Sequence, residues 1–148
     1  GGLEVFVSEC RRSFVAQSSQ GAPSRLQRDV TAAIRRVSEE GWFGANVKIS
    51  EEAVLEEDGE GYSVDILLEG LTNGPRAVVE VDGPSHFLKA PRAHVTNGPT
   101  KLKHSHLALM GWDVLQVPYY AWGKLDRKAQ DVYIRELLSK YHHRADTP

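Results

Sequence analysis

Apolar and polar residues alternate along this chain with two different periods, and each period predicts a different kind of element. From residue 24 to 38, apolar positions recur every three or four residues, which is the spacing of one buried helical face. Ser24 and Gln27 predict a capping box, in which Ser24 caps the first turn and Gln27 reaches back to it. The predicted buried face consists of Leu26, Val30, Ala33, Ile34 and Val37.

Three stretches with strand patterns follow this helix. Residues 47–49 and 53–55 form a short strand region, residues 62–69 alternate well, with Leu67 the one apolar residue on the otherwise polar face, and residues 76–82 form the partner strand. The acidic stretch 56–61 is a predicted turn, and the Asn73-Gly74 pair is a common hairpin turn signal. These strands therefore predict an antiparallel hairpin sheet.

The second half of the chain predicts a helix, a strand and a helix. Pro99 opens the first helix and Gly111 ends it, and WDVLQVP at 112–118 is a strand pattern in which we expect Trp112 to be buried. For the aromatic residues at 119–122 we favour packing under the last helix over stacking with nucleic-acid bases. The last helix is predicted at 124–141, with an apolar face of Ala129, Val132, Tyr133, Leu137 and Tyr141.

The predicted order is helix, three antiparallel strands, helix, strand, helix. A hairpin sheet that gains a further strand after a crossover helix becomes a mixed sheet flanked by helices, so the expected class is α/β. Residues 1–23 hold a short apolar start and the polar stretch SSQGAP. We interpret them as a tail or linker ahead of a domain at 24–148.

Three carboxylates are candidates for a functional site on the predicted hairpin. If Asn73-Gly74 is the loop tip, Asp65 lies opposite Asp82, and the period of two places Asp65, Glu80 and Asp82 on one face of the sheet. The opposite, core face would hold Val64, Ile66, Leu68, Val79 and Val81.

Neighbouring carboxylates repel one another unless something offsets their charge. A divalent cation such as Mg²⁺ or Mn²⁺, with Asp65, Glu80 and Asp82 as ligands, is one solution, and basic side chains are another. His86 follows the strand closely enough to lie at the mouth of the same pocket. Solvated acids on the outer face of a hairpin are the alternative interpretation.

Charge is distributed unevenly over the 148 residues, although the net charge is only −2. Residues 39–60 contain eight acids and one base, whereas residues 83–112 contain no acid. A helix N-terminus at Asn97 binds anions through its free amides, and basic residues in a first turn are unfavourable unless an anion offsets them. We therefore expect phosphate contacts from His86, Lys89, Asn97, Thr100, Lys101, Lys103 and His104, with a solvated helix face as the alternative.

Two classes of protein are excluded by composition. The single Cys10 rules out an internal disulfide and a thiolate zinc cluster. No apolar run approaches the roughly 20 residues that a membrane-spanning helix needs, so we expect no membrane partner.

The segments YSVDILL at 62–68, VEVDGPSHF at 79–87 and the stretch 97–122 together resemble the RAP domain, an RNA-binding module abundant in apicomplexans. The resemblance implies a restriction-endonuclease-like fold, related to the very-short-patch-repair branch of the PD-(D/E)xK nucleases. It also implies a mitochondrial or plastid location, organellar messenger or ribosomal RNA as partner, and an upstream helical-repeat region in the full-length protein.

The resemblance also suggests catalytic residues. Asp65 and Glu80 match the two acids of the nuclease pattern, but Asp82 stands where the pattern has lysine. His86, or Lys101 or Lys103 from the following helix, could take the role of that lysine. Ser105 stands where RAP domains often carry arginine, which removes one phosphate-binding fork.

Three functions remain open at this point. The first is an RNA-binding module of an organellar protein for RNA processing, RNA stability or ribosome assembly, which holds phosphates next to an acidic pocket. The second is an active metal-dependent RNA endonuclease, with Asp65, Glu80, Asp82 and His86 as the catalytic candidates. The third is a protein-interaction domain on a vestigial nuclease fold.

Overall fold

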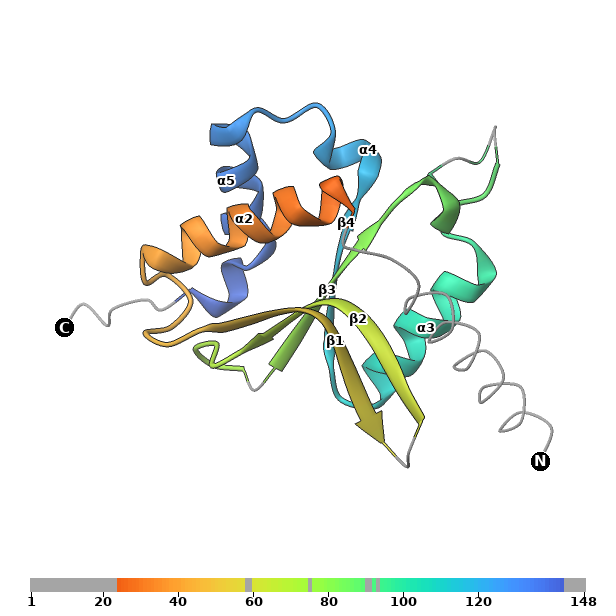
Figure 1. Cartoon of the computed structure of the whole chain (residues 1–148), viewed down its shortest axis with the longest axis horizontal. Helices are drawn as coiled ribbons and strands as arrows, with labels where there is room; N and C mark the ends of the chain where they lie inside the picture. Colours follow the sequence, from red (N-terminus) through yellow and green to blue (C-terminus); the bar gives the residue numbers. More distant parts are fainter. Residues whose placement is uncertain (1–23, 58–59, 75, 90–91, 93, 143–148) are drawn as a thin grey trace.

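The computed structural model describes residues 24–57, 60–74, 76–89, 92 and 94–142, so the interpretation of residues 1–23 as a tail lies outside it. The predicted α/β class and the order of its main elements are confirmed (Figure 1). No described helix is long and apolar enough to cross a membrane. The elements are α2 (Arg25–Glu39), β1 (Lys48–Glu57), β2 (Glu60–Glu69), β3 (Arg76–Asp82), α3 (Gly98–Leu109), β4 (Asp113–Pro118), α4 (Tyr119–Trp122) and α5 (Arg127–Leu137). Two 3₁₀ turns, Pro84–His86 and Ser139–Tyr141, complete them.

The four strands form one mixed sheet in the order β1-β2-β3-β4. β1 pairs with β2 and β2 with β3 in antiparallel fashion, whereas β3 and β4 are parallel. β3 therefore has a strand on each side, and all of its residues after Arg76 are buried. Any polar side chain on β3 after Arg76 is therefore buried inside the protein.

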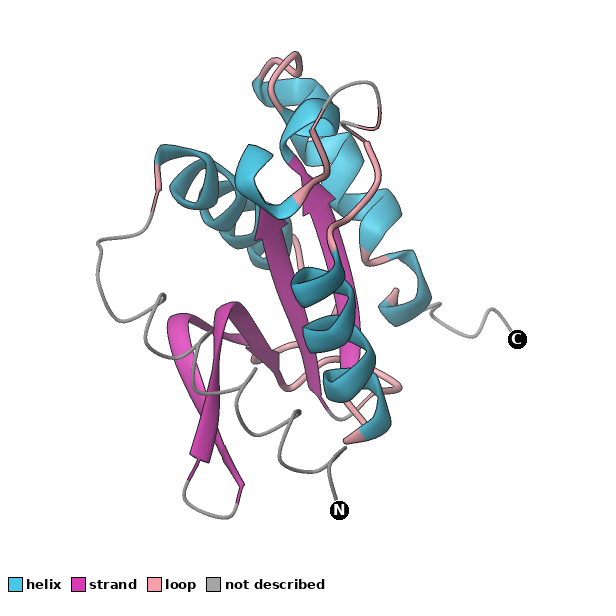
Figure 2. Cartoon of the chain, turned by 90° about the vertical axis from the view of Figure 1, so that its right-hand side faces the viewer, coloured by secondary structure: helices cyan, strands magenta, loops and turns pink. Residues whose placement is uncertain are grey.

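Helices cover both faces of the sheet (Figure 2). α2 and α5 pack on one face over Ile66, Val79 and Val117. α3 packs on the other, where Leu107 contacts a second apolar cluster that includes Val78. The result is a three-layer arrangement with β3 at its centre.

The first predicted helix is confirmed almost residue for residue. Ser24 caps α2 by accepting a hydrogen bond from the Gln27 backbone N–H, and the predicted apolar face is buried or partly buried. The second half of the predicted capping box is wrong, because the Gln27 side chain does not turn back to Ser24. Its amide instead donates to the Asp65 carbonyl at 3.2 Å and so ties α2 to β2.

The hairpin between β2 and β3 has a different register from the one expected. Its closing pair is Glu69 and Arg76, so the loop spans residues 70–75 and is not a two-residue Asn73-Gly74 turn. Two backbone positions with positive φ, Gly70 and Asn73, reverse the chain in this longer loop. The shift is an even number of residues, so each strand keeps its faces, but Asp65 does not lie opposite Asp82.

β2 also bends away from β3 at Asp65. The β2–β3 ladder ends at the pair Ile66 and Val79, and the Val81 N–H donates to the Asp65 carboxylate at 2.7 Å instead of to a backbone carbonyl. Beyond this point the β1–β2 hairpin curls toward the α3 side (Figure 1). Val64 consequently packs in the α3 cluster and not, as predicted, on the same face as Ile66.

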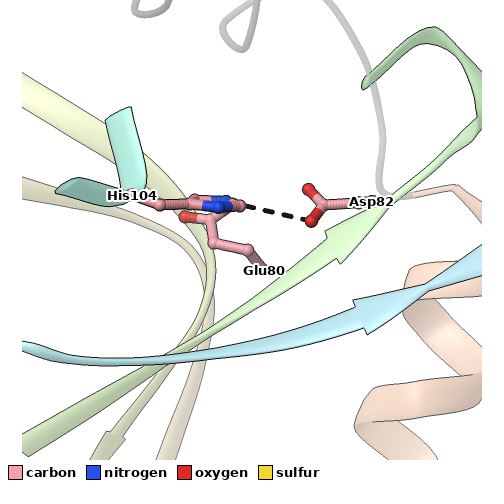
Figure 3. Close-up of side chains that lie close together, drawn as sticks. All are labelled: Glu80, Asp82 and His104. Carbon is pink, nitrogen blue, oxygen red and sulfur yellow. Dashed lines mark ion pairs between the residues drawn. The ribbon is translucent and has the colours of Figure 1, made fainter. Parts of the chain in front are cut away.

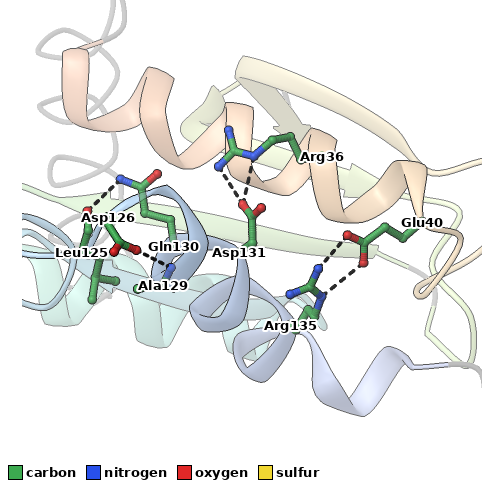
Figure 4. Close-up of polar contacts among 8 residues, drawn as sticks. All are labelled: Arg36, Glu40, Leu125, Asp126, Ala129, Gln130, Asp131 and Arg135. Atoms are coloured by element: carbon green, nitrogen blue, oxygen red, sulfur yellow. Dashed lines mark hydrogen bonds and ion pairs between the residues drawn. The ribbon is translucent and has the colours of Figure 1, made fainter.

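The C-terminal part differs most from expectation. The short helix α4 follows β4 directly, and α5 is shorter than the predicted 124–141. Val132 of the predicted apolar face is 45% exposed, while Ile134 and Leu138 are buried. The ion pairs Arg36–Asp131 and Arg135–Glu40 join α5 to α2 (Figure 4) and fix this orientation.

Candidate functional site

The carboxylates predicted to share one face gather at the C-terminal end of β3. Glu80 and Asp82 alternate with Val79 and Val81, which face α2 and α5, so the two acids point toward the α3 layer. Each is only 1% exposed. Asp65 joins them from β2, where its carboxylate accepts the Val81 N–H and interacts with Glu80.

α3 supplies the basic residues that face these acids. Thr100, Lys103, His104 and Leu107 are its buried residues, and they follow the spacing of one helical face. Three of the four are polar, which is unusual for a core-facing helix. Lys101 lies on the exposed side of the same helix. The basic stretch of the sequence is therefore divided between the interior and the surface.

Lys103 compensates the charge of Glu80. Its Nζ lies 3.2 Å from Glu80 Oε1 and 3.3 Å from Oε2, and both side chains are almost fully buried. Burial raises the pKa of Glu80 well above its ordinary value, and the Lys103 ammonium opposes that shift. Lys103, a residue of the helix that follows β3, thus pairs directly with one of the predicted acids.

Asp82 has weaker compensation than Glu80. Its Oδ1 lies 3.3 Å from His86 Nδ1 and its Oδ2 lies 3.8 Å from His104 Nε2, distances that suit ion pairs only if the rings are protonated. Neither oxygen has a hydrogen-bond partner among the described residues, and both are buried. Burial lowers the pKa of His104, an effect that Asp82 only partly opposes, so its ring is neutral near pH 7. A buried carboxylate in this state is costly.

Glu80, Asp82 and His104 can hold a metal ion. One ligand atom from each lies within 4.8 Å of the others. Figure 3 shows the His104 ring directed from α3 toward Asp82, with Glu80 beside it on the same strand as Asp82. Two carboxylates and a neutral imidazole suit Mn²⁺, which accepts a nitrogen ligand more readily than Mg²⁺. The buried oxygens of Asp82 without hydrogen bonds are the observation that makes the fit specific.

This set differs from the trio of acids expected from the sequence. Glu80 and Asp82 are common to both, but His104, which the sequence suggested only as a phosphate contact, takes the third position. Asp65 is not part of the group of three. The spacing of 100, 103, 104 and 107 was the available signal for His104, because it places both Lys103 and His104 on the buried face of α3.

The other predicted site residues surround this cluster. His86 is partly exposed, and its Nδ1 lies 3.4 Å from Thr100 Oγ1. Asn97 caps α3 by accepting the Thr100 N–H, and its amide donates to the Ser85 carbonyl. Lys89 and Lys101 are exposed. All of them lie around the N-terminus of α3 except Lys89, which extends into the loop that precedes it.

Glu52 is a fourth acid that the sequence did not indicate. Burial raises its pKa, a hydrogen bond from Gln27 opposes this, and the charges of Asp65 and Lys103 also act on it. Its φ of 48° is a strained conformation for glutamate. This backbone conformation directs Glu52, a residue of the outer strand β1, toward the site.

Comparison with known families finds a match over the part of the chain that carries most of this site. Residues 79–137 match the model described as the RAP domain. The matched segment runs from β3 to the end of α5 and includes Glu80, Asp82, Lys103 and His104, whereas Asp65 on β2 precedes it.

Replacing the Asp82 carboxylate by a neutral amide should stabilise the protein. In Asp82→Asn we expect the free energy of unfolding to rise by about 1–3 kcal/mol, because a buried charge without hydrogen bonds is removed at constant size. Urea unfolding in the presence of a chelator measures the change. Asp131→Asn, which weakens the partly exposed pair with Arg36, is the control and should lower stability by about 0.2–1 kcal/mol. A less stable Asp82→Asn variant would show that the two histidines already satisfy this carboxylate.

Proposed function

The chain contains a RAP domain, an RNA-binding module, and we propose that it seats an RNA phosphate at the cluster of Glu80, Asp82 and His104. The buried Asp82 oxygens carry the proposal, because they have no hydrogen-bond partner among the described residues and only the imidazoles of His86 and His104 lie close to them. A divalent cation held by Glu80, Asp82 and His104 would supply that charge and attract a phosphate oxygen.

The surroundings of the cluster also suit a phosphate. The free amides of the first turn of α3 lie at the same end of the helix as Thr100 and the exposed Lys101. The segment from Gly83 to Trp112, which contributes the loop before α3 and α3 itself, contains no acid that would repel a polyanion. Lys103 is turned inward to Glu80 and supports the site from within.

The resemblance to the RAP domain also suggests a biological setting. We propose that the RNA is an organellar messenger or ribosomal RNA in a mitochondrion or plastid, and that the domain serves RNA processing, RNA stability or ribosome assembly. An upstream helical-repeat region would provide most of the sequence specificity. A vestigial domain that binds only protein is the competing hypothesis, and it requires no salt-dependent affinity for RNA.

Manganese should stabilise the wild-type domain. At a Mn²⁺ concentration of about 100 times the dissociation constant, the free energy of unfolding should rise by about 2.7 kcal/mol. Each kcal/mol should raise the melting temperature by about 2–4 °C. The gain should shrink as the pH falls, because protons compete for Glu80, whose pKa burial raises, and for His104. Thermal unfolding with and without MnCl₂ measures it.

Asp82→Asn should lose most of this gain, whereas Asp29→Asn should keep it, since Asp29 is an exposed residue of α2 away from the cluster. Equal manganese shifts in the two variants would place the cation elsewhere.

The affinity for single-stranded RNA should fall with salt, and Lys101 should contribute to the slope. We expect Lys101→Ala to reduce the slope of log K against log salt by about 0.7, the share of one phosphate contact on a single strand. Lys128→Ala removes an equally exposed lysine from α5 and is the matched control. Fluorescence anisotropy over a series of KCl concentrations measures both. Absence of any slope in the wild type would favour the protein-interaction hypothesis.

RNA cleavage is the second candidate function, and the Lys103–Glu80 pair favours it. Nucleases of the pattern that the sequence resembles place a lysine next to two acids, and here Lys103 from α3 reaches the position that Asp82 leaves without one. Its ammonium could stabilise negative charge on an attacked phosphate. The Nε2 of His86, a partly exposed ring at the mouth of the pocket, could accept a proton from water.

If the domain cleaves RNA, wild type with Mn²⁺ should shorten a labelled RNA and Glu80→Gln should not. Lys103→Met should lose cleavage by at least about 100-fold, within the usual range for a group that acts on charge in the transition state. It should still bind RNA, because Lys101 and the first turn of α3 are unchanged. Gel analysis of the products, with circular dichroism as the check of folding, decides the outcome. If wild type and Glu80→Gln leave the RNA equally intact, the domain binds RNA without cutting it.

A further inference from the structure

The described residues at the two ends of the segment between His86 and Asn97 pair with each other beside the site. The Asn97 N–H donates to the His86 carbonyl at 2.9 Å, and the Leu88 N–H donates to the Val95 carbonyl at 2.8 Å. Phe87 and Thr96 form a β-bridge between these two bonds. The two ends of the loop are therefore held side by side, one at the His86–Asp82 contact and the other at the cap of α3.

One exposed ring of this loop lies flat on a second ring from another element. The rings of His94 and Tyr120 have centroids 3.8 Å apart and an interplanar angle of 17°, which is a parallel stack. Tyr120 is fixed in turn by edge contacts with Phe87 and Tyr119, both with centroids 5.5 Å away. His94 itself is exposed. Among the described residues, the stack thus ends in an exposed flat ring that contacts the ring of Tyr120.

The stack lies at the same end of the sheet as the carboxylate cluster. Tyr119 and Tyr120 open α4 directly after Pro118, and Pro118 is the residue of β4 that pairs with Asp82. The loop carrying His94 starts at His86, whose Nδ1 lies 3.3 Å from Asp82 Oδ1. Two separate connections, one through α4 and one through the loop, therefore join the stack to the cluster.

Core packing accounts for only part of this arrangement. Trp122 of the aromatic cluster is 2% exposed and belongs to the core, as the sequence suggested. Tyr119 and Tyr120 are only partly buried. The described part of the loop also exposes Lys89, Arg92 and two apolar side chains, Leu88 at 38% and Val95 at 43%. Cations, apolar groups and a flat ring at one surface match a nucleotide, which has both a phosphate and an aromatic base.

We propose that His94, supported by Tyr120, is a stacking platform for one unpaired RNA base next to the phosphate held at Glu80, Asp82 and His104. This inference rests on the proposed RNA-binding function and adds to it a requirement for single-stranded RNA. The base adds to the stack on the exposed face of His94. Because the His94 ring is already ordered against Tyr120, little conformational entropy is lost when a base binds.

The test uses short single-stranded RNAs in which each nucleotide is replaced in turn by an abasic one, and it measures affinity by fluorescence anisotropy. In the wild type, one abasic position should lower the affinity by about 5-fold or more, the lower range of base–aromatic stacking. His94→Ala should lose a similar factor on intact RNA and should be insensitive to that abasic position. His94→Phe keeps a flat ring without the imidazole nitrogens and should bind like the wild type.

The molecule contains a matched control for this experiment. Trp42 and His142 form another pair of close rings, with centroids 4.4 Å apart, and Trp42 is 40% exposed at the end of the molecule where α2 ends. Trp42→Ala should leave both the affinity and the abasic profile unchanged. Its outcome separates a specific platform from a general contribution of exposed aromatic residues.

The platform is wrong if RNA binds but no abasic position matters, or if His94→Ala remains as sensitive to the abasic position as the wild type. In both cases a salt-dependent affinity would persist and the proposed function would stand. Binding by His94→Phe as weak as by His94→Ala would also overturn stacking and would indicate a hydrogen bond or a charge. If the wild type binds no RNA at any salt concentration, the proposed function fails, and the platform fails with it.

Discussion

Two carboxylates on the central strand of a covered sheet cannot reach water, and many of the surrounding side chains are arranged so that they compensate the buried charge. Glu80 and Asp82 are each 1% exposed, on a strand with neighbours on both sides and a helix above. Burying an ion costs several kcal/mol unless charge and hydrogen bonds compensate it. Glu80 receives both from Lys103. Asp82 has only the imidazoles of His86 and His104 beside it and no hydrogen bond among the described residues, so the two carboxylates differ in how well they are compensated.

One face of the helix α3 packs against the two carboxylates, and another face is exposed to solvent. Residues two apart on a helix point about 200° away from each other, so Lys101 and Lys103, neighbours in a basic stretch, have opposite surroundings. Lys103 serves as an internal counter-ion, and Lys101 is exposed. Two lysines that are close in the sequence therefore have different electrostatic roles, one in the interior and one at the surface.

The class, the order of the main elements and the faces of β2 and β3 could be predicted because they depend on periods of two and 3.6 residues. The hairpin register could not, because the Asn73-Gly74 pair signals a tight turn while the chain closes at Glu69 and Arg76. The packing of Val64 also could not be predicted from the sequence, since it depends on the curl of β2 at Asp65. On α5, Val132 and Ile134 are both apolar, and which of them is buried depends on the packing of α5 against α2, which two ion pairs accompany.

The candidate site was partly predictable for the same reason. Alternation along β3 places Glu80 and Asp82 on one face whatever the register, but the role of His104 depends on which face of α3 meets the sheet. That choice is a tertiary one, because the face holding Thr100, Lys103 and His104 is hardly more apolar than the rest of the helix. The sequence of α3 therefore has no amphipathic pattern that identifies the face packed against the sheet. The polar residues of the candidate site occupy the positions where an apolar stripe would normally lie.

The break in the β2–β3 ladder links these observations. Where the ladder stops, the Val81 N–H turns to the Asp65 carboxylate, and the Asp65 carbonyl accepts from Gln27 of α2. The backbone next to Glu80 and Asp82 is thus held by a side chain from β2, which is itself tied to the helix layer on the opposite face of the sheet. A regular ladder would satisfy Val81 through backbone alone and would carry β2 straight on beside β3. The curl instead directs Asp65 and Glu52 toward Lys103, so that the hairpin adds two acids to the group of charged side chains around Glu80.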